Sequence, residues 1–540
     1  MSGCGNQTCG SVVGAKAECI FASHPPGTFR AEPGRTRRNE DLSLAEETAQ
    51  PAVVGRAPRT VSPSGKSTGW IIAALAIAVV NLSLLQTLIV PVLSTIAGQL
   101  DESVSSVGWA LTANLLAAAV FTPIASRLGD VHGRRQVIVG IMLLVITGSL
   151  ISLFTSSLPL LILARVMQGA SYGIFPLAMG VLRDEIAPKK LTMAMSIVAA
   201  MLAAGGVVGL VSTGVLTSGG GDYHHPFWIG LGVSLVALVL CWFALPRHKG
   251  PDAGGRVDWV GAAVLGVGLV LLLLAISQGH VWGWGSVWTI GALVGGVLVL
   301  LGWIQLQRRT AQPLINPTML ARRAVMVPNI AGLLVGFGMF STFLAVSSFV
   351  EIPREIAGFG FSASVLTASA LYLLPAGVLG VVLAPVMGRL VNSKGPRVVL
   401  LAGGALGFLG FAGLLLMHDS PWQVVLFGSI AQLAVTFGFA ALPALLVQAV
   451  SPAETGAANS VNSIMRSVGS AVASALTVTL LTGNTNEKTG IPLVDGFIWV
   501  MVLGAVAYVA VIVLTLIGLP GRPRAARSLV GRTNLAAEPA

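Results

Sequence analysis

The sequence predicts an all-α integral membrane protein with fourteen transmembrane helices. Of its 540 residues, 54% are hydrophobic and only 10% are charged, whereas soluble chains carry about 25% charged residues. Fourteen apolar stretches can be counted, and a helix needs about 20 such residues to span a bilayer. Little chain is left for a soluble catalytic domain, so we do not expect an enzyme.

The predicted spans are separated by short polar loops. Their expected bounds are 70–93, 104–125, 136–154, 158–182, 192–216, 227–245, 259–277, 287–305, 325–349, 363–386, 397–416, 422–446, 459–481 and 495–518. Residues 1–69 are rich in Pro, Gly, Ser and charge, which predicts a disordered cytoplasmic tail. A second cytoplasmic tail is expected at 519–540.

The basic residues predict the orientation in the membrane. With the N-terminus in the cytoplasm, 28 of the 32 Lys and Arg fall in tails and loops on the cytoplasmic side, and only Arg354 and Lys488 fall outside. Because basic loops resist translocation, both termini are expected in the cytoplasm of a cell-membrane protein. The net charge of +11 lies in these loops and forms no patch, so nucleic acid is not an expected partner.

An internal repeat predicts how the spans are grouped. Residues 127–135 and 389–397 match at the first, second, seventh and ninth positions, and Asp130 pairs with Asn392. The two segments follow the second and the tenth span. We therefore expect a six-helix bundle at 70–245, an inserted pair of spans at 246–324, and a related six-helix bundle at 325–518. Two related bundles with a site between them are typical of alternating-access transporters.

The first copy of the repeat holds a candidate latch on the cytoplasmic side. Gly133 permits a tight turn, and Asp130 can form hydrogen-bonded ion pairs with Arg134 and Arg135 that must break when this side opens. The alternative is a basic loop that only sets the topology. Its recurrence in the second half favours the latch.

Polar stripes inside the spans predict a cavity. Arg165, Gln168 and Tyr172 share one face of the fourth span, Ser463 and Arg466 belong to a stripe of the thirteenth, and Gln86 lies on a polar face of the first. A buried arginine must face protein or water, not lipid. Such stripes can also hold helices together, but two arginines favour a functional cavity. No carboxylate falls in the middle of a predicted span.

Other sequence features narrow the chemistry. Gly205, Gly209 and Gly214 of the fifth span are expected to permit close helix packing. No HExxH or CxxC arrangement is present, so no metal or cofactor is expected.

These motifs resemble the major facilitator superfamily, and specifically its fourteen-span drug–proton antiporter branch. The resemblance runs over residues 70–518. It is carried by the segment Asp130 to Arg135, by Arg165-Val-Met-Gln168-Gly169, by Asn462-Ser-Ile-Met-Arg466-Ser-Val-Gly469, and by the inserted spans with Asp258-Trp259 and Gln278 to Trp284. It implies export of hydrophobic compounds in exchange for protons.

The chain departs from that branch at two places. Where the branch usually carries an acid late in the first span, this chain has Gln86. The fifth-span motif, normally Gly-Pro followed by paired glycines, reads Gly209 to Gly214 without the proline.

We therefore predict a secondary active exporter of amphipathic small molecules, such as a drug, an antibiotic or a secondary metabolite. The expected path for substrate and protons is lined by Gln86, Asn114, Arg165, Gln168, Tyr172 and Arg466. The alternative is a facilitator-type transporter of a specific polar or anionic metabolite. The sequence does not indicate an oligomeric state.

Overall fold

The computed structural model describes residues 68–217, 221–247, 255–486, 489 and 491–519. In this part of the chain, fourteen helices are long and apolar enough to cross a membrane, which confirms the predicted number. The two predicted tails lie almost wholly outside the described residues.

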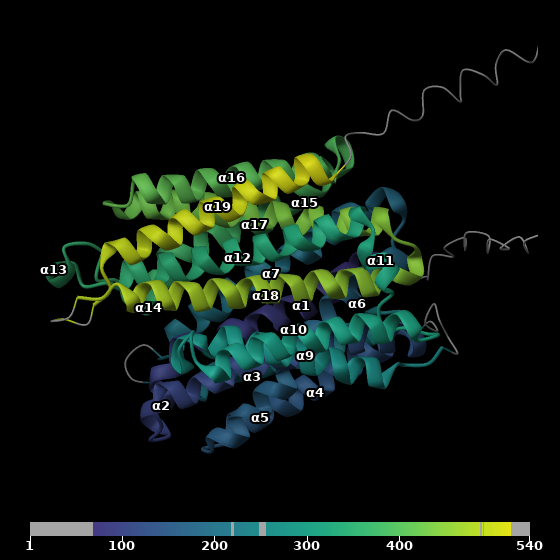
Figure 1. The fold of residues 1–540 in the computed structure, drawn as a ribbon, viewed down its shortest axis with the longest axis horizontal. Coiled ribbons are helices and arrows are strands. Elements are labelled where there is room, and N and C mark those ends of the chain that lie inside the picture. The colour runs from purple at the N-terminus through teal and green to yellow at the C-terminus, as the bar shows by residue number, and fades with distance from the viewer. Residues whose placement is uncertain (1–67, 218–220, 248–254, 487–488, 490, 520–540) are drawn as a thin grey trace, which may run out of the picture. The chain divides into compact units, whose positions relative to one another are not determined.

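The helices follow the order of the predicted spans (Figure 1). The first six spans are α1 (Thr68–Thr87) with η1 (Val90–Val92) and α2 (Leu93–Gln99), α3 (Val104–His132), α4 (Arg134–Phe154), α5 (Leu158–Gly169) with η2 (Ala170–Gly173) and α6 (Ile174–Glu185), α7 (Pro188–Thr217) and α8 (His225–Ala244). The inserted pair is α9 (Trp259–Trp282) and α10 (Val287–Arg309), followed by the short α11 (Pro317–Ala321).

The last six spans follow the inserted pair. They are α12 (Arg323–Glu351), α14 (Val365–Thr367) with η3 (Ala368–Leu373) and α15 (Leu374–Lys394), α16 (Pro396–Leu416), α17 (Pro421–Ala449), α18 (Thr455–Gly483) and α19 (Val494–Gly518). The short elements α13 (Arg354–Ala357) and η4 (Pro452–Glu454) lie in the connections.

Single glycines make the turns of the repeated motif. Gly133 joins α3 to α4 with a φ of 105°, and Gly395 joins α15 to α16 with a φ of 90°. Only glycine adopts such angles without strain. The expected loop at 127–135 is therefore a one-residue turn, and Asp130 lies in the last turn of α3. The repeat extends further, because Pro123 and Pro385 each lie ten residues before these glycines.

Most helix contacts fall within two groups. In the first group, α1 packs on α7 and α8, and α4 packs on α5 and α8; in the second, α12 packs on α17, α18 and α19. Gly205 and Gly469 hold related positions, since a Cβ at Gly205 would meet the backbone of Val80 in α1 and a Cβ at Gly469 would meet that of Leu333 in α12. The two groups contact each other through α7 with α15 and α17, and through α18 with α3 and α6.

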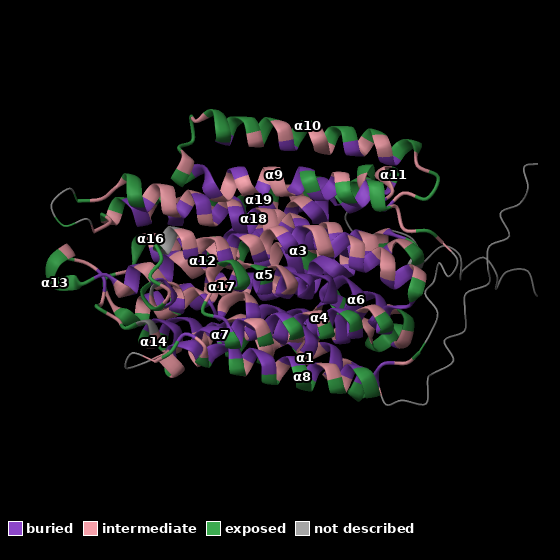
Figure 2. Ribbon diagram, turned by 90° about the horizontal axis from the view of Figure 1, so that it is seen from below, coloured by how far each residue is buried: buried purple, intermediate pink, exposed green. Residues whose placement is uncertain are grey.

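The inserted pair lies beside these groups. Helix α9 packs on α3, α18 and α10, whereas α10 packs mainly on α9 and keeps most of its surface exposed (Figure 2). Asp258 explains the start of the pair, because its carboxylate accepts hydrogen bonds from Gly261 N (2.8 Å) and from Gln307 Nε2 of α10 (2.6 Å).

We call the two ends of the helices the basic end and the distal end. The basic end holds the turns at Gly133 and Gly395, the start of α18 and the short α11, and it carries Arg127, Arg183, Arg256, Arg322 and Arg397. The distal end holds α2, α13 and the turn between α9 and α10 (Figures 1 and 2).

Candidate functional site

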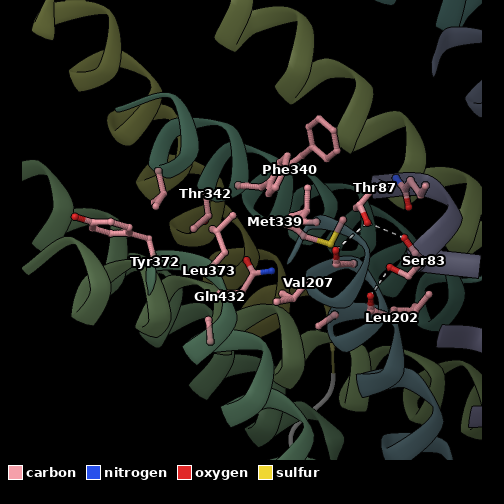
Figure 3. Close-up of a pocket in the computed structure, with 18 residues that line it drawn as sticks. Ser83, Thr87, Leu202, Val207, Met339, Phe340, Thr342, Tyr372, Leu373 and Gln432 are labelled. Atoms are coloured by element: carbon pink, nitrogen blue, oxygen red, sulfur yellow. Dashed lines mark hydrogen bonds between the residues drawn. The ribbon is translucent and has the colours of Figure 1, made fainter. Parts of the chain in front are cut away.

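Three neighbouring chambers lie between the two helix groups, and Gln86 lines all of them. The α9 chamber, of about 320 Å³, lies between α1, α3, α9, α12 and α18. The α7 chamber lies between α1, α7, α12, η3, α15 and α17 (Figure 3). The central chamber lies among α1, η2, α17 and α18. Tyr172 and Arg466 are among the residues that line it.

The α9 chamber extends toward the distal end. Val90, Leu93 and Val478, which lie near the distal ends of their spans, line the α9 chamber. By contrast, every residue that lines a chamber is at least ten residues from the basic end of its helix, which is roughly 15 Å at ~1.5 Å per residue. The cavity is therefore closed at the basic end in this structure.

Hydrogen bonds fix the side of α1 that faces the cavity. Ser83 Oγ donates to the carbonyl of Leu202, and Thr87 Oγ1 donates to that of Gly206 (2.8 Å), so α1 is tied to α7 on both sides of Gln86 (Figure 3). Gly209 allows this approach, because a Cβ there would meet Thr87 Oγ1. Gly214 lies at the contact between groups, where a Cβ would be 3.3 Å from Leu366 Cα.

Arg466 lines the central chamber and lies over two phenylalanine rings. Its Cζ is 5.0 Å from the ring centre of Phe175 on α6 and 4.9 Å from that of Phe439 on α17. Its Nη2 donates to Ser463 Oγ (3.2 Å). No Asp or Glu lines any of the three chambers among the described residues. Aromatic faces thus take the place of a carboxylate beside this cation.

Two polar groups on the chamber walls have no hydrogen-bond partner within the described chain. They are Tyr172 Oη in the central chamber and Gln432 Oε1 in the α7 chamber, where Gln432 lies between Tyr372 and Thr87 (Figure 3). Buried polar groups are normally paired. A bound solute or water with both donor and acceptor groups would satisfy them.

Arg165 and Gln168, which were predicted on the path, line none of the three chambers. Arg165 is fully buried, and its Nη1 donates to the carbonyl of Leu85 (2.9 Å) and to Gln168 Oε1 (2.6 Å). Gln168 in turn donates to Ser149 (3.2 Å), and Asn114 donates to the carbonyl of Arg165 (2.9 Å). Because α1 ends at Thr87, its last backbone carbonyls have no hydrogen-bond donor within the helix. Arg165 donates to one of these carbonyls, that of the residue before Gln86. Asn114 also lines the α9 chamber.

Arg134 and Arg135, which were both predicted to pair with Asp130, contact different partners. Arg134 Nη2 lies 3.2 Å from Asp130 Oδ1, and its Nη1 pairs with Asp184 of α6. Arg135 instead donates to the carbonyl of Trp242 in α8 (2.6 Å) and lies 4.9 Å from that indole ring. The cluster around Asp130 therefore contains Arg134 and Asp184, whereas Arg135 fastens α4 to α8.

Arg183, one of the basic residues that predict the orientation, makes a contact between the two groups at the basic end. Its guanidinium donates to Thr455 Oγ1 and to the carbonyls of Ser451 (3.2 Å) and Val450 (3.2 Å), so α6 is bound to the junction of α17 and α18. Gly456 brings α18 close to α3, because a Cβ there would lie 3.4 Å from Asp130 Oδ2.

Comparison with known proteins identifies the family. The sequence pattern of the Major Facilitator Superfamily matches residues 75–259, 259–474 and 376–537. The chain belongs to this superfamily. Human organic anion transporter MFSD10 has a similar fold, with a TM-score of 0.55 and 13% identity over 83% of this chain and 98% of that one.

The relatives of this chain include drug and antibiotic export proteins of the superfamily. It is 30% identical to the cephamycin export protein CmcT of Amycolatopsis lactamdurans over 87% of this chain and 96% of that one. It is 26% identical to the multidrug resistance protein B homolog of Mycobacterium tuberculosis over 76% and 78%. A uridine/deoxyuridine transporter of Lactococcus lactis is 28% identical over 67% and 77%. The chain spans 61% of the length of an uncharacterized MFS-type transporter of M. tuberculosis that is 29% identical to it.

Proposed function

We propose that this major facilitator protein exports neutral or acidic amphipathic small molecules by alternating access, in exchange for protons. The observation that carries the proposal is the cavity around Gln86, which is lined by Arg466 and, among the residues that the structure describes, by no carboxylate. A cation removed from water needs a nearby negative charge or several acceptors. A neutral or acidic compound instead meets donors at Tyr172 and Arg466.

The basic end is assigned to the cytoplasm, because its arginines would resist translocation. The cavity then faces outward in this structure, and export requires the groups 70–245 and 325–518 to rock so that the basic end opens. Arg183 and the Asp130 cluster hold the closed state. An impermeant thiol reagent applied to intact cells tests this orientation: Thr485→Cys should react and Ser393→Cys should not, and the reverse pattern would overturn it.

Transport by inside-out vesicles tests the proposed activity. A suitable pair of fluorescent probes is 8-anilino-1-naphthalenesulfonate and N-phenyl-1-naphthylamine, which share one skeleton and differ by the anionic sulfonate. Accumulation should collapse when nigericin removes the pH gradient, and the probe should in turn release protons from the vesicle interior. Accumulation that is unaffected by either the pH gradient or the membrane potential would contradict proton exchange.

The second candidate is facilitated transport of a specific polar metabolite. The similarity to a uridine/deoxyuridine transporter favours it, as do the amide and hydroxyl groups on the cavity walls. Gradient-driven movement of uridine in both directions, without a requirement for a pH gradient and with no transport of the naphthyl probes, would support this candidate over export.

A further inference from the structure

Helix α9 of the inserted pair closes one of the two seams between the helix groups. The groups touch at both seams: Val207 of α7 packs against Gly377 of α15 at the seam without α9, and α3 contacts α18 at the seam that α9 covers. At this seam α9 contacts α3 and α18 together. Ser277 Oγ lies 3.1 Å from Thr112 Oγ1 of α3, and Trp284 Nε1 donates to Thr479 Oγ1 of α18 (3.0 Å). The inserted pair is thereby fixed to both groups near the distal end.

One face of α9 forms a wall of the largest chamber. Leu273, Ser277 and His280 lie at positions i, i+4 and i+7, which share one side of a helix, and all three line the α9 chamber. The fourteen-span arrangement thus gives this cavity side chains that neither six-helix group supplies.

His280 differs from every other residue on the chamber walls. A histidine is the side chain whose ordinary titration falls between pH 5 and 8. The other polar residues that line this chamber are Gln86 and Thr87 of α1, Thr112 and Asn114 of α3, Ser277 of α9, and Ser470 and Ser474 of α18; none is charged or titrates in this range. Tyr172 and Arg466 line the adjoining central chamber.

We propose that Ser277 and His280 form a binding subsite on α9 for an anionic or hydrogen-bond-accepting part of the substrate. This subsite rests on the proposed export function and specifies where the acidic end of the compound binds. The Ser277 hydroxyl can donate at any pH. Protonation of His280 adds a positive charge at the distal mouth, so an anion binds more tightly there when the distal solution is acidic.

Charge-selective labelling tests the subsite without any need for transport. In a variant whose four native cysteines are replaced by serine, Ser277→Cys in nanodiscs is treated with sulfonatoethyl or trimethylammonioethyl methanethiosulfonate. The same thiolate attacks the thiosulfonate sulfur of either reagent and releases methanesulfinate, so the ratio of the anionic to the cationic rate reports the local charge. We expect this ratio to rise about threefold or more from pH 8 to pH 5.5. The charge of a protonated His280 lies one helical turn from the thiol and is screened less there than in bulk water. In the His280→Gln background the ratio should stay constant.

A second cysteine variant keeps the test valid if the first variant misfolds. Thr112→Cys, on the opposite wall, should show the same dependence on His280. The sulfonate probe should slow both labelling reactions, and more strongly at pH 5.5, whereas N-phenyl-1-naphthylamine should show no such pH effect. A pH-independent ratio at both positions, or thiols that neither reagent reaches, would overturn the subsite while leaving probe export intact. Failure of vesicle transport with pH-dependent labelling would overturn the export function instead.

Discussion

The guanidinium of Arg466 on α18 stacks on Phe175 of α6 at 5.0 Å from the ring centre, which joins the two helix groups beneath the cavity. The same guanidinium lies 4.9 Å from the ring centre of Phe439 on α17. A change that separates α6 from α18 must break the first contact and can keep the second, because α17 and α18 belong to the same group. Arg466 is thus placed to sense both the substrate and the opening of the basic end.

Replacing Arg466 should separate anionic from neutral substrates. Arg466→Gln keeps a donor but removes the charge, and a charge-assisted hydrogen bond is worth about 1.5–3 kcal/mol. We expect export of 8-anilino-1-naphthalenesulfonate to fall about tenfold or more and that of N-phenyl-1-naphthylamine to fall much less. Initial rates in vesicles measure both. An equal loss for the two probes would show that Arg466 acts only through its packing.

Removing the Arg183 side chain should favour opening of the basic end. Arg183→Ala deletes three hydrogen bonds that join α6 to the second group. We expect a cysteine at Ser460, which is fully buried at this end, to be labelled roughly ten times faster, as the loss of about 1.4 kcal/mol or more predicts. The matched control is Arg135→Ala, whose contacts stay within the first group. Equal labelling in both variants would contradict the role of Arg183.

Asp130→Asn should impair the same closed state by another route. The substitution keeps the shape of the side chain and removes the charge that faces Arg134 at 3.2 Å. Because Arg134 and Asp130 are both buried, the arginine loses a partner that burial makes necessary. We expect slower export, faster labelling at Ser460→Cys, and normal amounts of folded protein. Wild-type export by this variant would mean that the motif serves only to set the topology.

Gly469→Ala should destabilise the protein. An added Cβ would overlap the carbonyl of Leu333 in α12, and overpacking of this kind costs about 1–3 kcal/mol. The control is Gly302→Ala on α10, where a Cβ meets no other atom within 4 Å. Thermal unfolding in detergent should show a lower midpoint for the first variant only. Unchanged stability in both would contradict the close packing of α18 on α12.

The number and order of the spans could be predicted from the sequence because each follows from local composition. A helix that crosses a bilayer needs a long apolar run, and the repeated glycine turns lie at fixed positions in the chain. The sequence also placed Gln86, Tyr172 and Arg466 on polar faces, and these residues line the chambers.

The partners of these polar residues could not be predicted, because they depend on which helices become neighbours. The periodicity of the fourth span puts Arg165 and Tyr172 on one face, yet the bend through η2 leaves Tyr172 at the cavity and Arg165 behind α1. Nothing local marks Arg183 or Phe175 as contacts between groups. The role of His280 depends on the contacts of α9 with α3 and α18, which the local sequence does not indicate.

The charge preference of export tests the central claim most directly. The rates to compare are those of N-phenyl-1-naphthylamine, its sulfonate and the cationic dye ethidium, each measured in inside-out vesicles with the wild-type protein and with Gln86→Asp. We predict that the wild-type protein exports the neutral and anionic probes in preference to ethidium, and that the aspartate shifts the preference toward ethidium, because it adds the carboxylate that the cavity walls lack. A wild-type preference for ethidium that Gln86→Asp leaves unchanged would contradict the proposed cavity.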